Sequence, residues 1–247
     1  MASTSETGHA KNVANFEDLI SFCTGYGASY NPSKIAIKIE ALNTLFTQAE
    51  DIIDDVKSAN IGFINATNAR VIAFSPIKPL ATRIVNALSA TDATDELIKD
   101  AKAFNRKVQG SRKGVNTTTE NPVPNPDSPT GSKQISVSQQ SYDSLVENFT
   151  KLGMLAISEP SYTPNEVDLQ LVTLTAFVDD LKAKNTAVVN ATTAVSNARI
   201  ARNNILYNEN TGLVNIALDV KKYVKSVFGA ASPQYKQVSK IKFTKPK

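Results

Sequence analysis

The amino-acid sequence predicts an all-α protein, an elongated helical bundle built from a tandem internal duplication. Residues 30–74 are repeated without a gap at residues 162–206, and nine of these 45 positions are identical, among them Tyr30/Tyr162, Pro32/Pro164 and Arg70/Arg202. Within both copies, apolar residues recur three and four positions apart, which is typical of a long amphipathic helix. We therefore expect two long helices, about 33–74 and 164–206, together with shorter return helices.

The first copy is expected at residues 13–110, after a flexible polar tail at residues 1–12. A short amphipathic helix at 15–24 should precede Pro32, which suits the first turn of the long helix because no amide hydrogen is needed there. Gly62 weakens this helix and could bend it or end it early. Pro76 ends it, since proline removes a hydrogen-bond donor.

Two shorter helices are predicted to follow the long helix of the first copy. The first contains Leu80, Ile84 and Leu88, which share one face. Thr94 is expected to cap the second, because a threonine side chain accepts a hydrogen bond from the first turn. These helices should cover part of the apolar seam of the long helix.

The second copy is expected at residues 140–240, after a Pro/Ser/Thr-rich linker at residues 111–139 that contains four prolines. Asn208 and Gly212 should end its long helix, and Ser232 followed by proline should cap a last short helix. Packing the two long helices against each other would bury both apolar seams.

Positive charge is concentrated at the C-terminus. The formal net charge is +4, and residues 219–247 contain eight lysines and a single carboxylate, Asp219. We expect a basic tail at residues 241–247. Such a segment suits phosphates, an acidic protein or a membrane surface, and the plainer interpretation is a solubilising C-terminus.

Three arginines near the ends of the long helices are candidate contact residues. Arg70 and Arg202 are equivalent in the two copies, and Arg199 lies one turn before Arg202. Cations at helix C-termini are stabilised by the helix dipole, and an anion site built from both copies is the alternative. Together with Lys240, Lys242 and Lys245, these arginines are the predicted contacts for an anion or a partner.

The residues that catalysis needs are scarce in this chain. The single cysteine, Cys23, lies in an apolar stretch and suggests a small buried side chain, and the only histidine, His9, falls in the predicted tail. One Cys and one His cannot supply a zinc cluster, and no phosphate-binding glycine loop is present. The acidic run at 50–55 suggests a solvated helix face rather than a metal site. We therefore predict no catalytic, cofactor-binding or metal-binding residues and no small-molecule substrate.

These observations favour a non-enzymatic structural or interaction protein, a helical scaffold whose expected partner is another protein or a further copy of itself. Two alternatives remain open. Residues 61–74 are weakly polar and could insert into a membrane, as in a pore-forming bundle, and the lysine-rich C-terminus could bind nucleic acid. No secretion signal or transmembrane segment is predicted, so we expect a cytoplasmic protein, with export by a signal-independent route left open.

Overall fold

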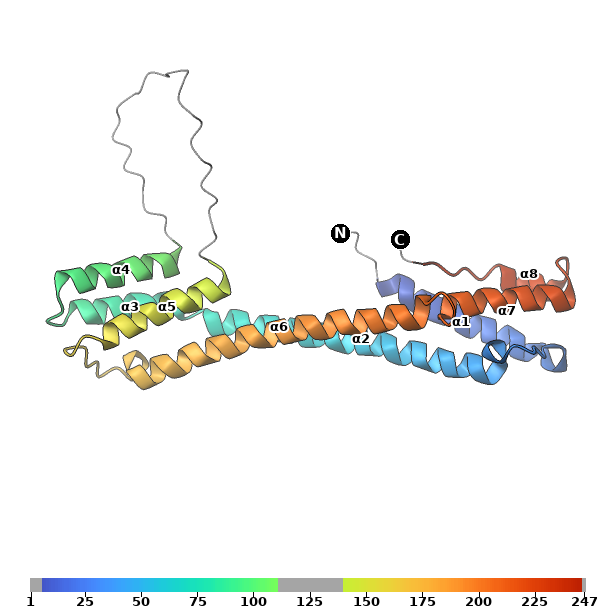
Figure 1. Ribbon diagram of the computed structural model, residues 1–247, viewed down its shortest axis with the longest axis horizontal. Helices are drawn as coiled ribbons and strands as arrows, with labels where there is room; N and C mark the ends of the chain where they lie inside the picture. Colours follow the sequence, from blue (N-terminus) through green and yellow to red (C-terminus); the bar gives the residue numbers. More distant parts are fainter. Residues whose placement is uncertain (1–5, 111–139, 246–247) are drawn as a thin grey trace, which may run out of the picture. The chain divides into compact units, whose positions relative to one another are not determined.

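A computed structural model describes residues 6–110 and 140–245, which form α-helices, three short 3-10 turns and loops, with no β-strand among them (Figure 1). The all-α prediction is therefore confirmed. The predicted linker at 111–139 lies outside the described residues. The helices in chain order are α1 (Glu6–Gly25), α2 (Ile39–Phe74), α3 (Ile77–Ser89), α4 (Asp95–Gln109), α5 (Tyr142–Ile157), α6 (Leu171–Tyr207), α7 (Leu213–Phe228) and α8 (Pro233–Ser239).

The chain divides into two compact units, and neither unit coincides with one sequence copy. The first unit comprises Met1–Asn65 and Asn190–Lys247, and the second comprises Ala66–Val189. In the first unit, α1 of the first copy packs against α7 and α8 of the second copy. In the second unit, α3 and α4 of the first copy pack against α5 of the second copy. The predicted repeats 13–110 and 140–240 therefore stay a prediction, and each compact core contains helices from both of these ranges.

The core of the first unit is an apolar cluster between α1, the start of α2, the end of α6, and α7. Phe16, Leu19 and Leu213 are fully buried in it. Helix α7 follows the 3–4 spacing, because its buried positions lie on one face. Helix α8 is capped as predicted, since the Ser232 side chain accepts a hydrogen bond from the amide of Tyr235 and Pro233 occupies the first turn.

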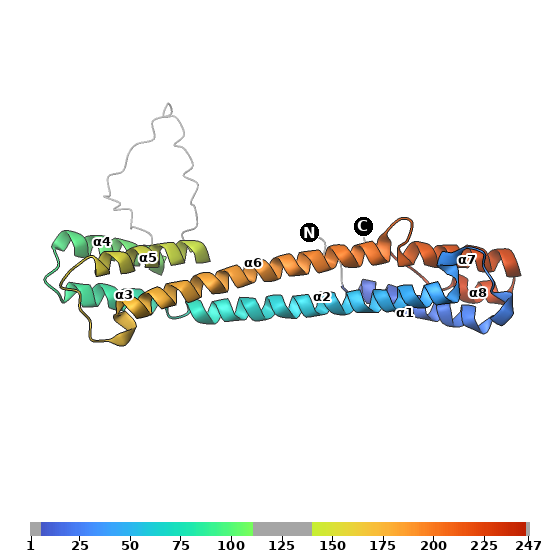
Figure 2. The same cartoon turned by 60° about the horizontal axis from the view of Figure 1, so that its bottom comes forward.

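The core of the second unit lies among α3, α4 and α5, which run side by side in two views (Figures 1 and 2). Phe149, Leu88 and Leu152 are fully buried there. The predicted cap of α4 is confirmed, because the Thr94 side chain accepts from the amide of Leu97 at 3.3 Å. Gly110 ends α4 with a φ of 79°, a left-handed conformation that glycine adopts without steric cost.

Both long helices begin later than the sequence predicted. Helices α2 and α6 start at Ile39 and Leu171, not near positions 33 and 164. The residues before them form an extended residue, a 3-10 turn (Ile35–Ile37 or Val167–Leu169) and a second extended residue. The prediction was wrong because proline suits a first helical turn but does not require one. Gly62 does not end the helix, because α2 continues to Phe74.

A buried tyrosine holds this helix start in each copy. The Tyr30 hydroxyl donates to the Ile37 carbonyl oxygen at 2.6 Å, and the Tyr162 hydroxyl donates to the Leu169 carbonyl oxygen at 3.2 Å. Each bond fixes the last carbonyl of the 3-10 turn, so the helix proper starts two residues later. The two starts are therefore built alike, at the same separation of 132 positions that relates the sequences.

An ion pair joins each of these helix starts to a neighbouring helix, with opposite polarity in the two units. In the first unit, Lys34 before α2 pairs with Asp219 of α7 at 2.6 Å. In the second unit, Asp168 before α6 pairs with Arg83 of α3 through both guanidinium nitrogens. The side chains of both pairs are partly exposed, so each pair makes only a small contribution to the packing of its helix start.

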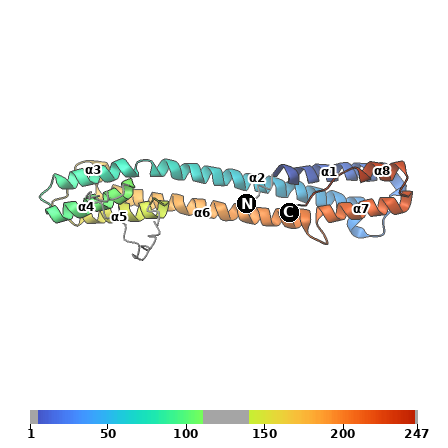
Figure 3. The ribbon, with the colours of Figure 1, turned by 90° about the horizontal axis from the view of Figure 1, so that it is seen from above.

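The predicted N-terminal tail is wrong from residue 6 onward, because these residues form the first turns of α1. His9 and Asn12 are buried on the same face as Phe16. Asn12 anchors the C-terminal segment, donating to the Thr244 carbonyl oxygen at 2.7 Å and accepting from the Thr244 amide at 3.0 Å. The chain after α8 therefore runs back along α1 (Figure 3), and residues 241–245 are part of the first unit.

Candidate functional site

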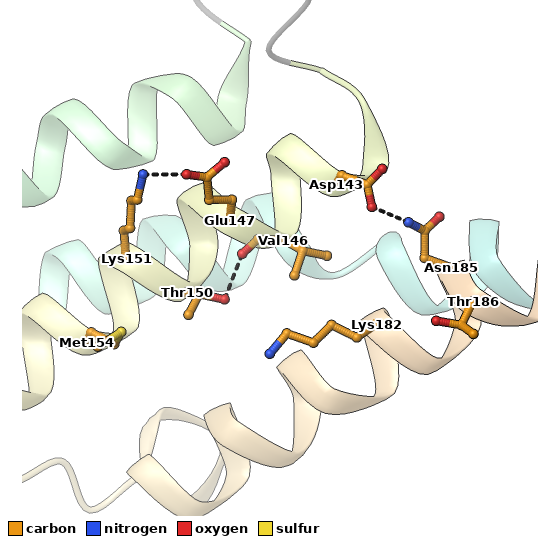
Figure 4. Close-up of a pocket in the computed structure, with 9 residues that line it drawn as sticks. All are labelled: Asp143, Val146, Glu147, Thr150, Lys151, Met154, Lys182, Asn185 and Thr186. Atoms are coloured by element: carbon orange, nitrogen blue, oxygen red, sulfur yellow. Dashed lines mark hydrogen bonds and ion pairs between the residues drawn. The ribbon is translucent and has the colours of Figure 1, made fainter. Parts of the chain in front are cut away.

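One hollow of the second unit is a groove between α5 and α6, which we call the α5–α6 groove (Figure 4). It has a volume of about 530 Å³ and is open to solvent. A second hollow of about 200 Å³ continues it toward the start of α6 and shares Thr150, Met154 and Lys182 with it. The floor of the continuation is apolar, with Phe149, Ile157, Leu171, Leu174 and Val178 among its lining residues.

The charged side chains of the α5–α6 groove are paired with one another or with close neighbours. Glu147 accepts from Lys151 one turn along α5 at 2.5 Å, and this ammonium group lowers the pKa of Glu147 below its ordinary value. Lys182 lies 3.8 Å from Asp179, and its side chain extends between the two helices in Figure 4. An ionised, paired carboxylate is a poor general acid, so this lining suits binding better than proton transfer.

Asn185 closes one end of the groove and links three helices. Its amide nitrogen donates to Asp143 at the start of α5, and its carbonyl oxygen accepts from an Arg70 terminal nitrogen at 2.9 Å. The Arg70 guanidinium lies 3.9 Å above the centre of the Tyr142 ring. Such a cation–π contact stabilises a partly desolvated arginine. This network fixes the end of α2 against α5 and α6 within the second unit.

Arg70, the first of the predicted contact residues, is thus engaged inside the second unit. Its Nε atom is buried and has no acceptor among the described residues. Arg202 belongs to the first unit, where it is 3% exposed and donates to the side chain of Asn203. Arg199 is exposed on the same helix. The role of these arginines as anion or partner contacts stays a prediction.

The three predicted lysines, Lys240, Lys242 and Lys245, are exposed in the first unit. Lys240 directly follows α8, and the Lys242 carbonyl oxygen accepts from the Asn15 side chain at 2.6 Å. Their backbone is therefore positioned by α8 and α1, while their ammonium groups remain in solvent. Lys221 of α7 is closer to the interior, and burial lowers its pKa.

Cys23 and His9 do not form a catalytic pair in the first unit. The thiol of Cys23 is buried and hydrogen-bonded to Tyr30, and burial raises its pKa to about 12. His9 Nδ1 lies 2.6 Å from the Tyr207 hydroxyl at the end of α6. Local composition does not predict the buried position of His9, because most residues before Val13 are polar or small. The spacing His9, Val13, Phe16, Ile20 would have indicated the longer helix.

The acidic run on α2 is solvated, as predicted. Glu50, Asp51, Asp54 and Asp55 are exposed, and Asp54 pairs with Lys57 at 2.7 Å. Across residues 6–110 and 140–245, no group of three or more His, Cys, Asp or Glu side chains is arranged to hold a metal ion. Over the same residues, no helix combines the length and the apolar character that crossing a lipid bilayer requires.

Comparison of the chain with protein-family models, with curated proteins and with solved structures finds no match.

Proposed function

We propose that the protein is a non-enzymatic helical scaffold that acts by binding protein, with a second copy of itself as the first partner to test. The α5–α6 groove carries this proposal. The hollow that continues the groove has an apolar floor, and its lining includes the exposed side chains of Met154 and Leu171. The charged side chains of the groove form ion pairs or hydrogen bonds with each other or with close neighbours. A catalytic site would instead need an unpaired titratable group with a shifted pKa.

The dimensions of the groove suit a helix as its occupant. Together with the hollow that continues it, the groove follows α5 from Asp143 to Ile157, and at 1.5 Å per residue this is roughly 20 Å, or about four helical turns. An amphipathic helix binds such a groove through apolar side chains at positions i, i+3, i+4 and i+7. The paired charges at Glu147–Lys151 and Asp179–Lys182 would then form a polar rim.

We further propose that the two copies descend from one ancestral unit by tandem duplication, and that they assemble as a bundle. The matched helix starts support this, because the tyrosine, the 3-10 turn and the first residue of the long helix recur 132 positions apart. The hydrogen bond from Arg70 of α2 to Asn185 of α6 supports a bundle arrangement within the second unit.

Sedimentation velocity at rising protein concentration tests the scaffold proposal. We expect reversible self-association or, for a hetero-partner, retention of specific proteins on the immobilised full chain. Met154→Lys places a charge over the apolar floor and should weaken the association at least tenfold. Ile35→Lys, at a position 76% exposed in the first unit, is the matched control and should have no effect.

Two results would count against the proposal in different ways. A protein that stays monomeric at every concentration and retains nothing would refute the scaffold function. If the Met154→Lys variant associates as strongly as the unaltered chain, the α5–α6 groove is excluded as the interface. The scaffold function itself would not be refuted by that result.

A pore-forming bundle is the second candidate. Ile61 and Ile64 in the α2 segment of the first unit are exposed, which supports contact of this predicted segment with an apolar environment. Dye leakage from vesicles is the test, and intact vesicles at high protein concentration would exclude the idea.

A further inference from the structure

The first unit contains a lysine-rich surface that the proposed scaffold function does not use. We call it the α7–α8 lysine surface, and its members are exposed or half-buried residues of α7, α8 and the following segment: Lys221, Lys225, Lys236, Lys240, Lys242 and Lys245. Side-chain contacts join the three elements. Lys221 Nζ donates to the Ile241 carbonyl oxygen and lies 5.2 Å from the Phe243 ring centre, and Lys225 Nζ lies 5.7 Å from the Tyr235 ring centre.

This positive charge is not neutralised within the described residues. None of the six lysines has an ion pair there. The single carboxylate of α7, Asp219, is already paired with Lys34 and Lys222. Glu17 and Asp18 of α1 are exposed and form no ion pair with the surface. A cluster of like charges held together by the fold is stabilised when an anion approaches it.

The composition of the surface favours a lipid membrane over nucleic acid. All its cations are lysines, whereas arginine is the residue that binds single phosphates through two parallel hydrogen bonds. Its aromatic rings, Tyr235 and Phe243, are half-buried beneath lysine ammonium groups rather than free to stack on bases. Leu218 is 43% exposed and lies seven residues before Lys225, so one apolar side chain shares the helix face with the lysines.

From these observations we infer that the α7–α8 lysine surface docks on an anionic lipid bilayer. The ammonium groups meet the lipid phosphates and carboxylates, and Leu218 contacts the boundary of the acyl region. The protein binds the membrane surface without crossing it. Each lysine near such a surface contributes about 1 kcal/mol, or roughly fivefold in partition coefficient.

Co-sedimentation of the full chain with vesicles tests this inference. Vesicles of phosphatidylcholine with phosphatidylserine should bind the protein at low salt, and vesicles of phosphatidylcholine alone should not. Binding should weaken as salt increases, because ions screen exposed charges. The triple variant Lys240→Gln, Lys242→Gln, Lys245→Gln should lower the partition coefficient roughly a hundredfold, the product of three fivefold losses.

Removal of two exposed lysines of the second unit, Lys99→Gln with Lys102→Gln, is the control and should leave binding nearly unchanged. Thermal melting followed by circular dichroism verifies that both variants are folded. Three outcomes would overturn the inference: no preference for phosphatidylserine, equal binding by the triple variant, or displacement of the protein from vesicles by duplex DNA at equal phosphate concentration. Binding without dye leakage separates this surface docking from pore formation.

Discussion

The tyrosine at each helix start gives a quantitative test of the structure. Tyr30→Phe removes one hydroxyl and leaves the ring in place against Tyr223, which it meets edge-on at 5.3 Å. The variant loses the 2.6 Å hydrogen bond to the Ile37 carbonyl oxygen and the contact with the Cys23 thiol. A buried hydrogen bond contributes about 0.5–1.5 kcal/mol, and an acceptor left unsatisfied costs about 1–3 kcal/mol. We therefore expect a loss of about 2 kcal/mol in the free energy of unfolding.

The second copy supplies the matched comparison. Tyr162→Phe removes a longer bond of 3.2 Å to the Leu169 carbonyl oxygen, so the expected loss is smaller, about 1 kcal/mol. Tyr235→Phe is the control. The Tyr235 hydroxyl makes no hydrogen bond to another described residue, so the free energy of unfolding should change by less than about 0.5 kcal/mol.

Urea unfolding followed by circular dichroism measures all three variants. The unfolding curve can show two separate transitions, because Tyr30 and Tyr162 belong to different compact units. Each variant is then expected to shift the transition of its own unit. If Tyr30→Phe were as stable as the unaltered chain, or if Tyr235→Phe were equally destabilised, the account of the helix starts would be refuted.

Four further predictions test other parts of the structure. Leu88→Ala, at a fully buried position of α3, should cost about 2–5 kcal/mol in urea unfolding, whereas Leu218→Ala on the exposed face of α7 should cost under 1 kcal/mol. Cys23 should resist thiol reagents at neutral pH in the folded protein and react in urea. Because its pKa rises from 9.0 to about 12 on folding, the unfolded thiol loses its proton first, and the stability it contributes should be lost as the pH rises from 9 toward 12. Asn12→Ala should speed hydrogen exchange at residues 241–245, which it anchors through Thr244; unchanged exchange would contradict this. Asp219→Lys should destabilise the first unit by opposing Lys34, and adding Lys34→Asp should recover part of the loss, as a double-mutant cycle would measure.

Only some residues of the candidate site could be predicted from the sequence. Arg70 was singled out because it recurs at Arg202, but its partners Tyr142 and Asn185 are more than 70 residues away in the chain. Nothing in their local sequence marks them. The α5–α6 groove was missed for the same reason, since its two walls come from separate helices whose individual patterns predict only burial. The lysine excess was visible, whereas its grouping on α7, α8 and the anchored segment was not.

The sequence by itself determined the helical class, the two long helices and the caps at Thr94 and Ser232, because these depend on the spacing of apolar residues and on local side-chain hydrogen bonds. Only the tertiary structure decided that each compact core combines helices of both copies, that His9 and Asn12 are buried, and that α2 and α6 start six or seven residues late. Periodicity states which face of a helix must be covered. It does not state which other segment covers it, because that depends on contacts between residues far apart in the chain.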